Sequence, residues 1–352
     1  MRDTMPRVAS LLLVTTFALG CGKELVEPDP VAPDAPGSTP QLTALEQCAI
    51  NGGTPSQQFM SNNLHGPVTS ITVHGSTVIL GSEDKSVKQW TVGSAAIYGQ
   101  PFTQDAGSVV GALAHTRAND ILGADGAGVL HRWTLADAAS DEAMTISANP
   151  LVAVGVNSNN SRAAVGERDV PNMRVIDLDT GTVSAPVTTT LWGVTSFAFS
   201  DADLLLDAGH NYNTPQIERR SVAAPMTVVD QWNDQTLSGA IRAIALDPAG
   251  TTLVAVGDGM VMTFDPMNLA AGPTTTTRVP EHLAVGVVLL GGRTHFVTVG
   301  SEGTLRVWAV ATGALVKTVT IPTPIGIGAD SDGTQVYTSG PDGFLHSYGC
   351  GA

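Results

Sequence analysis

An all-β fold built from repeated four-stranded units is what this sequence of 352 residues predicts, on three observations. Short valine- and threonine-rich runs alternate with glycine-containing turns, which suits strands better than long helices. A strand–turn–strand pattern returns about every 43 residues along most of the chain. The last copy lacks a fourth strand, whereas a spare segment precedes the first copy. Four short strands at such a period are typical of a β-propeller blade.

The period is marked by a bulky residue near the end of the third strand of each unit. Successive markers are 43, 43, 44, 44, 44 and 40 residues apart, a regularity that the alternative of two packed β-sandwiches would not require. In chain order the markers are Trp90, Trp133, Ile176, Arg220, Phe264, Trp308 and Tyr348. Seven markers predict seven blades, and Arg220 makes the fourth the least regular.

Each unit opens with an apolar first strand upstream of its marker. These strands are expected at residues 68–73, 109–113, 151–156, 194–199, 241–246, 284–289 and 325–329. A second apolar run follows, as at residues 253–256, and a turn such as residues 179–182 leads to the fourth strand.

Ring closure is expected to join the two ends of the repeat region. The last unit ends at Tyr348, and residues 47–62 belong to no other unit. Placing this segment beside Tyr348 removes two exposed strand edges, which are templates for aggregation. The predicted fold is therefore all-β, a seven-bladed β-propeller over residues 47–352 that is closed by an N-terminal strand completing the last blade.

The repeats resemble those of the WD-repeat family over roughly residues 48–350. The best copy, residues 300–308, is Gly-Ser-Glu-Gly-Thr-Leu-Arg-Val-Trp. The Trp-Asp dipeptide is never intact, and the Gly-His pair that precedes the first strand in that family is missing. The resemblance implies a degenerate bacterial WD-like propeller. A quinoprotein-type propeller, usually of eight blades, is the main rival.

A targeting segment is expected at residues 1–20. Arg2 and Arg7 precede an apolar stretch at residues 9–19, too short to span a bilayer, which needs roughly 20 apolar residues. The end of the stretch, Ala-Leu-Gly-Cys, resembles the lipobox of bacterial lipoproteins, which implies lipidation of Cys21. An ordinary secretory signal with a chance cysteine is the alternative. Residues 21–46 are proline-rich and acidic, as in an extended tether.

Two further cysteines, Cys48 and Cys350, lie at the two ends of the predicted ring. Outside the cytoplasm we expect them to form a disulfide rather than remain two unrelated thiols. The chain-entropy model gives roughly 5 kcal/mol as an upper figure for so long a loop.

Candidate interaction residues concentrate in the fourth unit. Residues 209–215 suggest an elongated loop, and we expect His210 and Tyr212 on it to lie near Trp192, because binding residues favour loops on rigid scaffolds. A tolerated insertion is the alternative. Acidic residues also recur in the turns between second and third strands, where they form either a binding rim or ordinary turn chemistry. They are Glu83, Asp84, Asp125, Glu167, Asp169, Asp258, Glu302 and Asp342.

Charge and motifs narrow the possible functions. The net charge of −15 repels phosphate backbones, so no nucleic acid is expected as a partner. No histidine pair has zinc spacing, and no nucleophile elbow or phosphate loop occurs, so no cofactor or metal is expected. We expect a monomeric, non-enzymatic scaffold, lipid-anchored in the cell envelope at the outer membrane, that binds an envelope protein or polymer. The alternative is a propeller enzyme (a hydrolase or quinoprotein oxidoreductase), or a carbohydrate- or metal-binding protein using the central channel.

Overall fold

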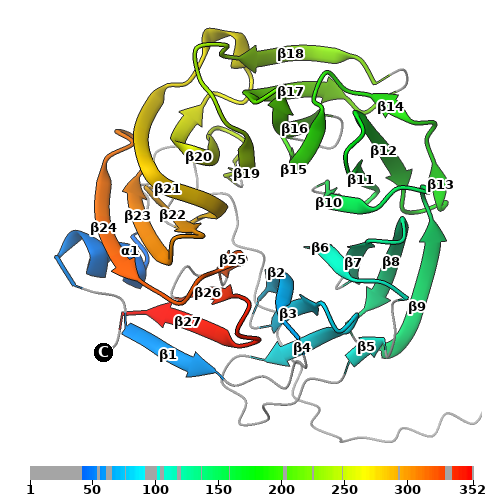
Figure 1. The fold of residues 1–352 in the computed structure, drawn as a ribbon, viewed down its shortest axis with the longest axis horizontal. Coiled ribbons are helices and arrows are strands. Elements are labelled where there is room, and N and C mark those ends of the chain that lie inside the picture. The colour runs from blue at the N-terminus through cyan, green and yellow to red at the C-terminus, as the bar shows by residue number, and fades with distance from the viewer. Residues whose placement is uncertain are drawn as a thin grey trace, which may run out of the picture. The chain divides into compact units, whose positions relative to one another are not determined.

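Antiparallel sheets stand around a central channel and form a β-propeller, which confirms the predicted fold class (Figure 1). The computed structural model describes residues 42–53, 56–60, 66–75, 77–91, 101–103, 107–116, 120–135, 137–157, 159–200, 204–223, 226–247, 249–291, 294–329 and 335–350. The predicted signal peptide, Cys21 and most of the tether lie outside these residues.

The first half of the described chain forms four sheets in chain order, each a meander that starts at the channel and ends at the outer rim (Figure 1). Their strands are β2 (Val68–His74), β3 (Thr77–Ser82), β4 (Val87–Thr91) and β5 (Pro101–Thr103); β6 (Val110–His115), β7 (Asp120–Asp125), β8 (Val129–Thr134) and β9 (Asp137–Thr145); β10 (Leu151–Val156), β11 (Arg162–Glu167), β12 (Asn172–Asp177), β13 (Thr182–Val183) and β14 (Val187–Thr188); and β15 (Gly193–Phe199), β16 (Leu204–Asn211), β17 (Thr214–Ser221) and β18 (Val228–Asn233).

A six-stranded sheet follows, so that strand pairing among the described residues gives six sheets rather than the seven predicted. Two of its strands run without interruption through segments predicted as separate strands. Its members are β19 (Ile241–Leu246), β20 (Leu253–Phe264), β21 (Thr275–Leu289), β22 (His295–Gly300), β23 (Thr304–Ala309) and β24 (Leu315–Thr320), with the short 3-10 helix η1 (Leu269–Ala271) between β20 and β21. The repeat pattern places a turn or link inside both β20 and β21. In β20 the register shifts between Asp258 and Met260, where Gly259 has a positive φ of 71°, and in β21 the pairing partner changes from β20 to β22.

The last sheet joins the two ends of the ring, as predicted. It contains β25 (Gly326–Ala329), β26 (Gln335–Ser339), β27 (Leu345–Gly349) and, at its outer edge, β1 (Ser56–Met60). β1 pairs antiparallel with β27, with Gln57 opposite Tyr348. The edge of β27 is thereby covered by backbone hydrogen bonds from the other end of the chain.

A helix that the sequence analysis did not predict packs outside this closure. α1 (Ala44–Ile50) starts with a capping box, in which Thr43 and Glu46 each bond to the backbone of the other. Leu45 is fully buried against the core formed by β22, β23 and β27. The Glu46 carboxylate is also buried, where it accepts hydrogen bonds from Thr294 Oγ1 (2.9 Å) and His295 N (3.1 Å). Burial alone would raise the pKa of Glu46, but hydrogen bonds from His295, Thr43 and Thr294 lower it to about 2.

The predicted disulfide is present between Cys48 in α1 and Cys350, the residue after β27. Its Cα atoms are 6.0 Å apart, and the two cysteines are separated by 302 residues in sequence. Cys48, expected at the N-terminal end of the predicted ring, lies in α1. The bridge thus ties this helix to the strand that β1 also covers.

The repeat markers lie between neighbouring sheets. Four markers have no exposed surface and Phe264 is 1% exposed; the four are Trp133, Ile176, Trp308 and Tyr348. Arg220, at the same repeat position, is also buried, with 4% of its surface exposed. Because a buried guanidinium needs compensating partners, the fourth unit must supply them.

Candidate functional site

The turn of the β16–β17 hairpin is where the strongest sequence candidates lie. The predicted elongated loop is instead a two-residue turn, since Asn211 pairs with Thr214 and only Tyr212 and Asn213 lie between. Both have positive φ, 46° and 69°, as a type I′ turn requires. The extra residues lengthen the two strands, each of eight residues. Residues 209–215 therefore form the end of a hairpin and not a long loop.

Two exposed aromatic rings meet at this hairpin. Trp192 lies just before β15, and its ring centroid is 5.2 Å from that of Tyr212, with the rings tilted by 38°. Their exposed fractions are 47% and 78%, so most of the pair faces solvent. Backbone bonds hold both partners: Trp192 N–H donates to the His210 carbonyl at 2.8 Å, and Gly239 N–H donates to the Asn213 carbonyl at 2.8 Å. The predicted proximity of Trp192 and Tyr212 is present in the structure.

The third candidate of this group, His210, is half-buried beside an ion pair at the channel. Desolvation and the nearby Arg242 guanidinium lower the pKa of His210, while Asp258 acts in the opposite direction. Arg242 binds Asp258 through two bonds, Nε–Oδ1 at 3.0 Å and Nη2–Oδ2 at 3.1 Å. A neutral imidazole and an internally balanced ion pair therefore lie next to the aromatic pair.

The acidic turn residues are engaged mainly in structural contacts. Asp84 accepts from Ser86 N at 2.9 Å, and the buried Asp125 accepts from Val129 N at 2.7 Å. Glu83 is exposed. In the described residues, no three histidine, cysteine or acidic residues are grouped so as to hold a metal. The contacts at Asp84 and Asp125 are those of the turn-chemistry alternative.

A basic residue two positions before the repeat marker binds the turn acid in four units. The basic residue is a histidine in two of these units and an arginine in the other two. The contacts are His131 Nε2–Asp125 Oδ2 at 3.5 Å, Arg174 Nε–Glu167 Oε1 at 3.1 Å, Arg306 Nη2–Glu302 Oε1 at 3.9 Å and His346 Nε2–Asp342 Oδ2 at 2.8 Å.

Glu302 takes part in a longer chain of hydrogen bonds around a buried histidine. Trp308 Nε1 donates to Thr298 Oγ1 at 2.8 Å, and the same hydroxyl lies 2.7 Å from His282 Nε2. The other ring nitrogen, Nδ1, is 2.6 Å from Glu302 Oε1. Burial would raise the pKa of Glu302, but the bonds from His282 and Thr304 lower it. The sequence analysis missed His282 because the residue before it is glutamate rather than glycine.

The partners of Arg220 are two buried carboxyl groups. Asp207 in β16 lies directly opposite Glu218 in β17, and both side chains are fully buried. Arg220 Nε is 3.3 Å from Asp207 Oδ2, and Nη2 contacts Glu218 Oε2. Two like charges placed opposite each other destabilise a sheet, so the guanidinium between them is required. Arg220 is therefore part of a buried charge cluster, although the sequence analysis interpreted it as a degenerate repeat position.

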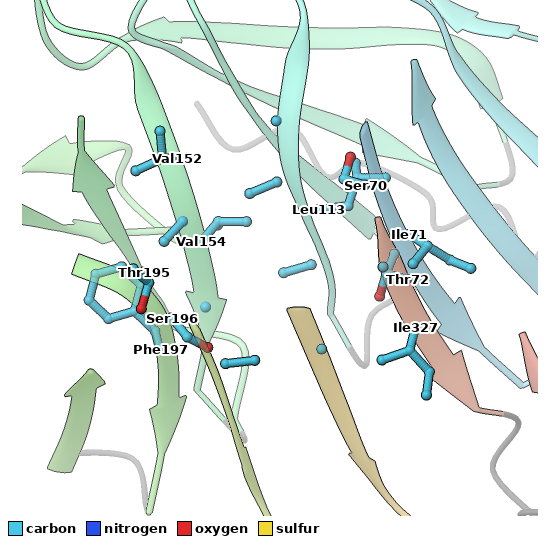
Figure 2. Close-up of a pocket in the computed structure, with 18 of the residues that line it drawn as sticks. Ser70, Ile71, Thr72, Leu113, Val152, Val154, Thr195, Ser196, Phe197 and Ile327 are labelled. Carbon is cyan, nitrogen blue, oxygen red and sulfur yellow. The ribbon is translucent and has the colours of Figure 1, made fainter. Parts of the chain in front are cut away.

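The central channel contains a cavity of about 540 Å³, within the range of small-molecule sites. Figure 2 shows part of its wall, where Thr72 of β2, Leu113 of β6 and Val154 of β10 are drawn. Lining residues come from seven strand regions, at β2, β6, β10, β15, β19, β21 and β25. Most are apolar, glycine, serine or threonine. Arg242 and His115 are the only arginine and histidine among them.

Comparison with known proteins gives no match, either to a protein-family model or to a curated protein sequence. In the part of the chain that the structure describes, no helix is long and apolar enough to cross a membrane.

Proposed function

We propose that this chain is a lipid-anchored, non-enzymatic β-propeller that acts as an interaction scaffold in the bacterial envelope. The observation that carries the proposal is the exposed Trp192–Tyr212 pair on a hairpin fixed at both sides by backbone bonds. Tryptophan and tyrosine are enriched at the centres of protein interfaces because they bury a large area at low entropic cost. The partner is another envelope protein or a polymer.

The blade count also belongs to this proposal. We infer that the six-stranded sheet acts as two blades of the seven predicted. In β21, residues 275–278 pair with β20, whereas residues 284–289 pair with β22. The hydrogen-bonding partner thus changes part-way along one continuous strand. The seven strand regions that line the channel support the same number.

The envelope location rests on the lipobox-like Cys21 and on the disulfide. A bridge between Cys48 and Cys350 is stable outside the reducing cytoplasm. A Cys21 that carries more than one acyl chain would attach the protein stably to a membrane. The acidic, proline-rich tether would then hold the propeller away from the anionic surface.

Replacement of Cys21 by serine is expected to abolish incorporation of radiolabelled palmitate and to release the protein from the membrane fraction. The control is Cys48→Ser/Cys350→Ser, which removes both cysteines of the disulfide and leaves Cys21 in place. Equal labelling of wild type and Cys21→Ser would show that Cys21 is not the acylation site.

The double substitution Trp192→Ala/Tyr212→Ala is expected to weaken partner binding at least tenfold, since each ring contributes on the order of 1–2 kcal/mol at an interface centre. Partners are captured by crosslinking in native membranes and their recovery is compared across variants. Leu315→Ala is the control, because Leu315 is 46% exposed but lies on β24. Unchanged recovery with the double variant would remove the hairpin surface from the proposal.

The channel supports a second candidate function, binding of a carbohydrate or other small ligand or catalysis on it. The specific observation is the cavity of about 540 Å³ with serine and threonine hydroxyls in its wall. A stoichiometric organic ligand or quinone in purified protein would favour this alternative over the scaffold.

A further inference from the structure

Two histidines that are far apart in sequence meet at one end of the channel. His74 is the last residue of β2, and His115 is the last residue of β6. The two strands are neighbours in the inner ring. Their ring centroids are 4.9 Å apart, and the ring planes are inclined by 54°. No spacing rule could have joined them, because the pairing depends on two adjacent sheets.

The pair adjoins the channel cavity through His115. Thr72 and His115 line the cavity, and Figure 2 shows Thr72 in the wall formed by β2. Alternate residues of a strand share a face, so His74 lies on the same face as Thr72. His115 is exposed and His74 is half-buried. A small ion in the channel could therefore reach the pair.

Thr72 orients the second ring. Its Oγ1 lies 3.1 Å from Nδ1 of His115. Metal-binding histidines commonly donate one ring N–H to a neighbouring oxygen, which fixes the tautomer and leaves the other nitrogen available. In the tautomer whose Nδ1–H donates to Thr72 Oγ1, Nε2 of His115 carries the lone pair.

The separation of the rings suits a shared metal ion. Imidazole nitrogens bind Zn²⁺ at about 2.0–2.1 Å, which places each ring centroid about 3.2 Å from the ion. Ligand angles between 90° and 109° then require centroids about 4.5–5.2 Å apart, at the same bond lengths. The observed 4.9 Å lies inside this interval.

We propose that His74 and His115 form an open two-histidine site for a late first-row divalent cation at the mouth of the channel. Among these ions Cu²⁺ is expected to bind most tightly to imidazole nitrogens. The two rings supply two ligands, and the remaining coordination positions are open to water or to a ligand in the channel. The site goes beyond the proposed scaffold function and does not depend on it.

The test uses the full chain in detergent, titrated with Cu²⁺ and followed by calorimetry and electron paramagnetic resonance. Wild type is expected to bind one equivalent more than His74→Gln/His115→Gln, with nitrogen couplings from two imidazoles. Each single variant is expected to lose that equivalent or bind it at least tenfold more weakly. Thermal unfolding of each variant checks that the fold is intact, and His115→Ala replaces any glutamine variant that fails this check.

Thr72→Val tests the orienting bond, because loss of such a contact weakens metal affinity about 10- to 100-fold. Thr69→Val is the matched control, since Thr69 lines the same cavity from the same strand but bonds to the Val110 carbonyl at 2.6 Å. Equal Cu²⁺ binding by wild type and the double histidine variant would overturn the proposal. Loss of binding on only one of the two histidine substitutions would overturn it too.

Discussion

Replacement of Arg220 by methionine is expected to lower the free energy of unfolding by about 3–5 kcal/mol, as is typical when one partner of a buried ion cluster is removed. The substitution keeps an unbranched chain of similar length but deletes the guanidinium. Asp207 and Glu218, both fully buried, would then lie opposite each other without a cation. Urea denaturation at neutral pH measures the change.

The loss is expected to grow with pH. Burial and the adjacent Glu218 raise the pKa of Asp207 well above its usual range, while Arg220 opposes that rise. A carboxyl group whose pKa is raised on folding stabilises the protein at low pH, and this stabilisation disappears as pH rises through the folded pKa. Without Arg220 that pKa rises further. The difference between wild type and Arg220→Met is therefore larger at about pH 8 than at about pH 5.

Two control variants separate charge from packing. Arg219→Met alters the neighbouring residue, whose side chain lies on the opposite face and is 3.9 Å from Asp230, so a loss of only about 1 kcal/mol is expected. Asp207→Asn/Glu218→Gln/Arg220→Met removes every charge and is expected to recover part of the stability. If Arg220→Met and Arg219→Met were equally stable, the buried cluster would have no special role.

The sequence predicted that Arg220 is unusual but not which residues it contacts. The period identified Arg220 as the irregular member of seven, because the other markers are apolar or aromatic. Its partners depend on the register of β16 against β17, which places Asp207 opposite Glu218. That register is set by the two-residue turn at Tyr212 and Asn213. The interpretation of residues 209–215 as a long loop concealed it.

Local signals were sufficient for some features and absent for others. The first strands were predicted close to their observed positions because their apolar runs recur with the period. The capping box of α1 at Thr43 and Glu46 is visible in the sequence. Residues 21–46 were nevertheless predicted to be one extended tether because the segment is rich in proline. The pairing of Asp258 with Leu283, which joins the fifth and sixth units into one sheet, has no such signal. The His74–His115 contact requires the ring itself.

Removal of the disulfide by Cys48→Ser/Cys350→Ser is the second large expected effect, a loss of about 2–5 kcal/mol in the free energy of unfolding. The bridge spans 302 residues, so it restricts the unfolded chain over nearly the whole propeller. In the folded chain it joins α1 to the end of β27. The denaturation midpoint is expected to fall, and reduced wild type should match the variant.

The loss should stay below the roughly 5 kcal/mol that the chain-entropy model sets as an upper figure. Non-covalent contacts keep the ends together without the bridge, because β1 pairs with β27 and α1 is anchored by the buried Leu45 and Glu46. The variant is therefore expected to remain a closed propeller with its strand content intact by circular dichroism. Amide exchange in β1 and α1 should accelerate most.

Glu46→Gln tests whether the disulfide and α1 act together in holding the two ends of the ring closed. The carboxylate accepts bonds from Thr43 N (2.7 Å), Thr294 Oγ1 and His295 N, so an amide that keeps the shape loses the charge. In the Cys48→Ser/Cys350→Ser background Glu46→Gln should loosen β1, whereas in the oxidised protein the covalent link limits that effect. Equal effects of Glu46→Gln in both backgrounds would mean that the disulfide and the helix stabilise the ring independently.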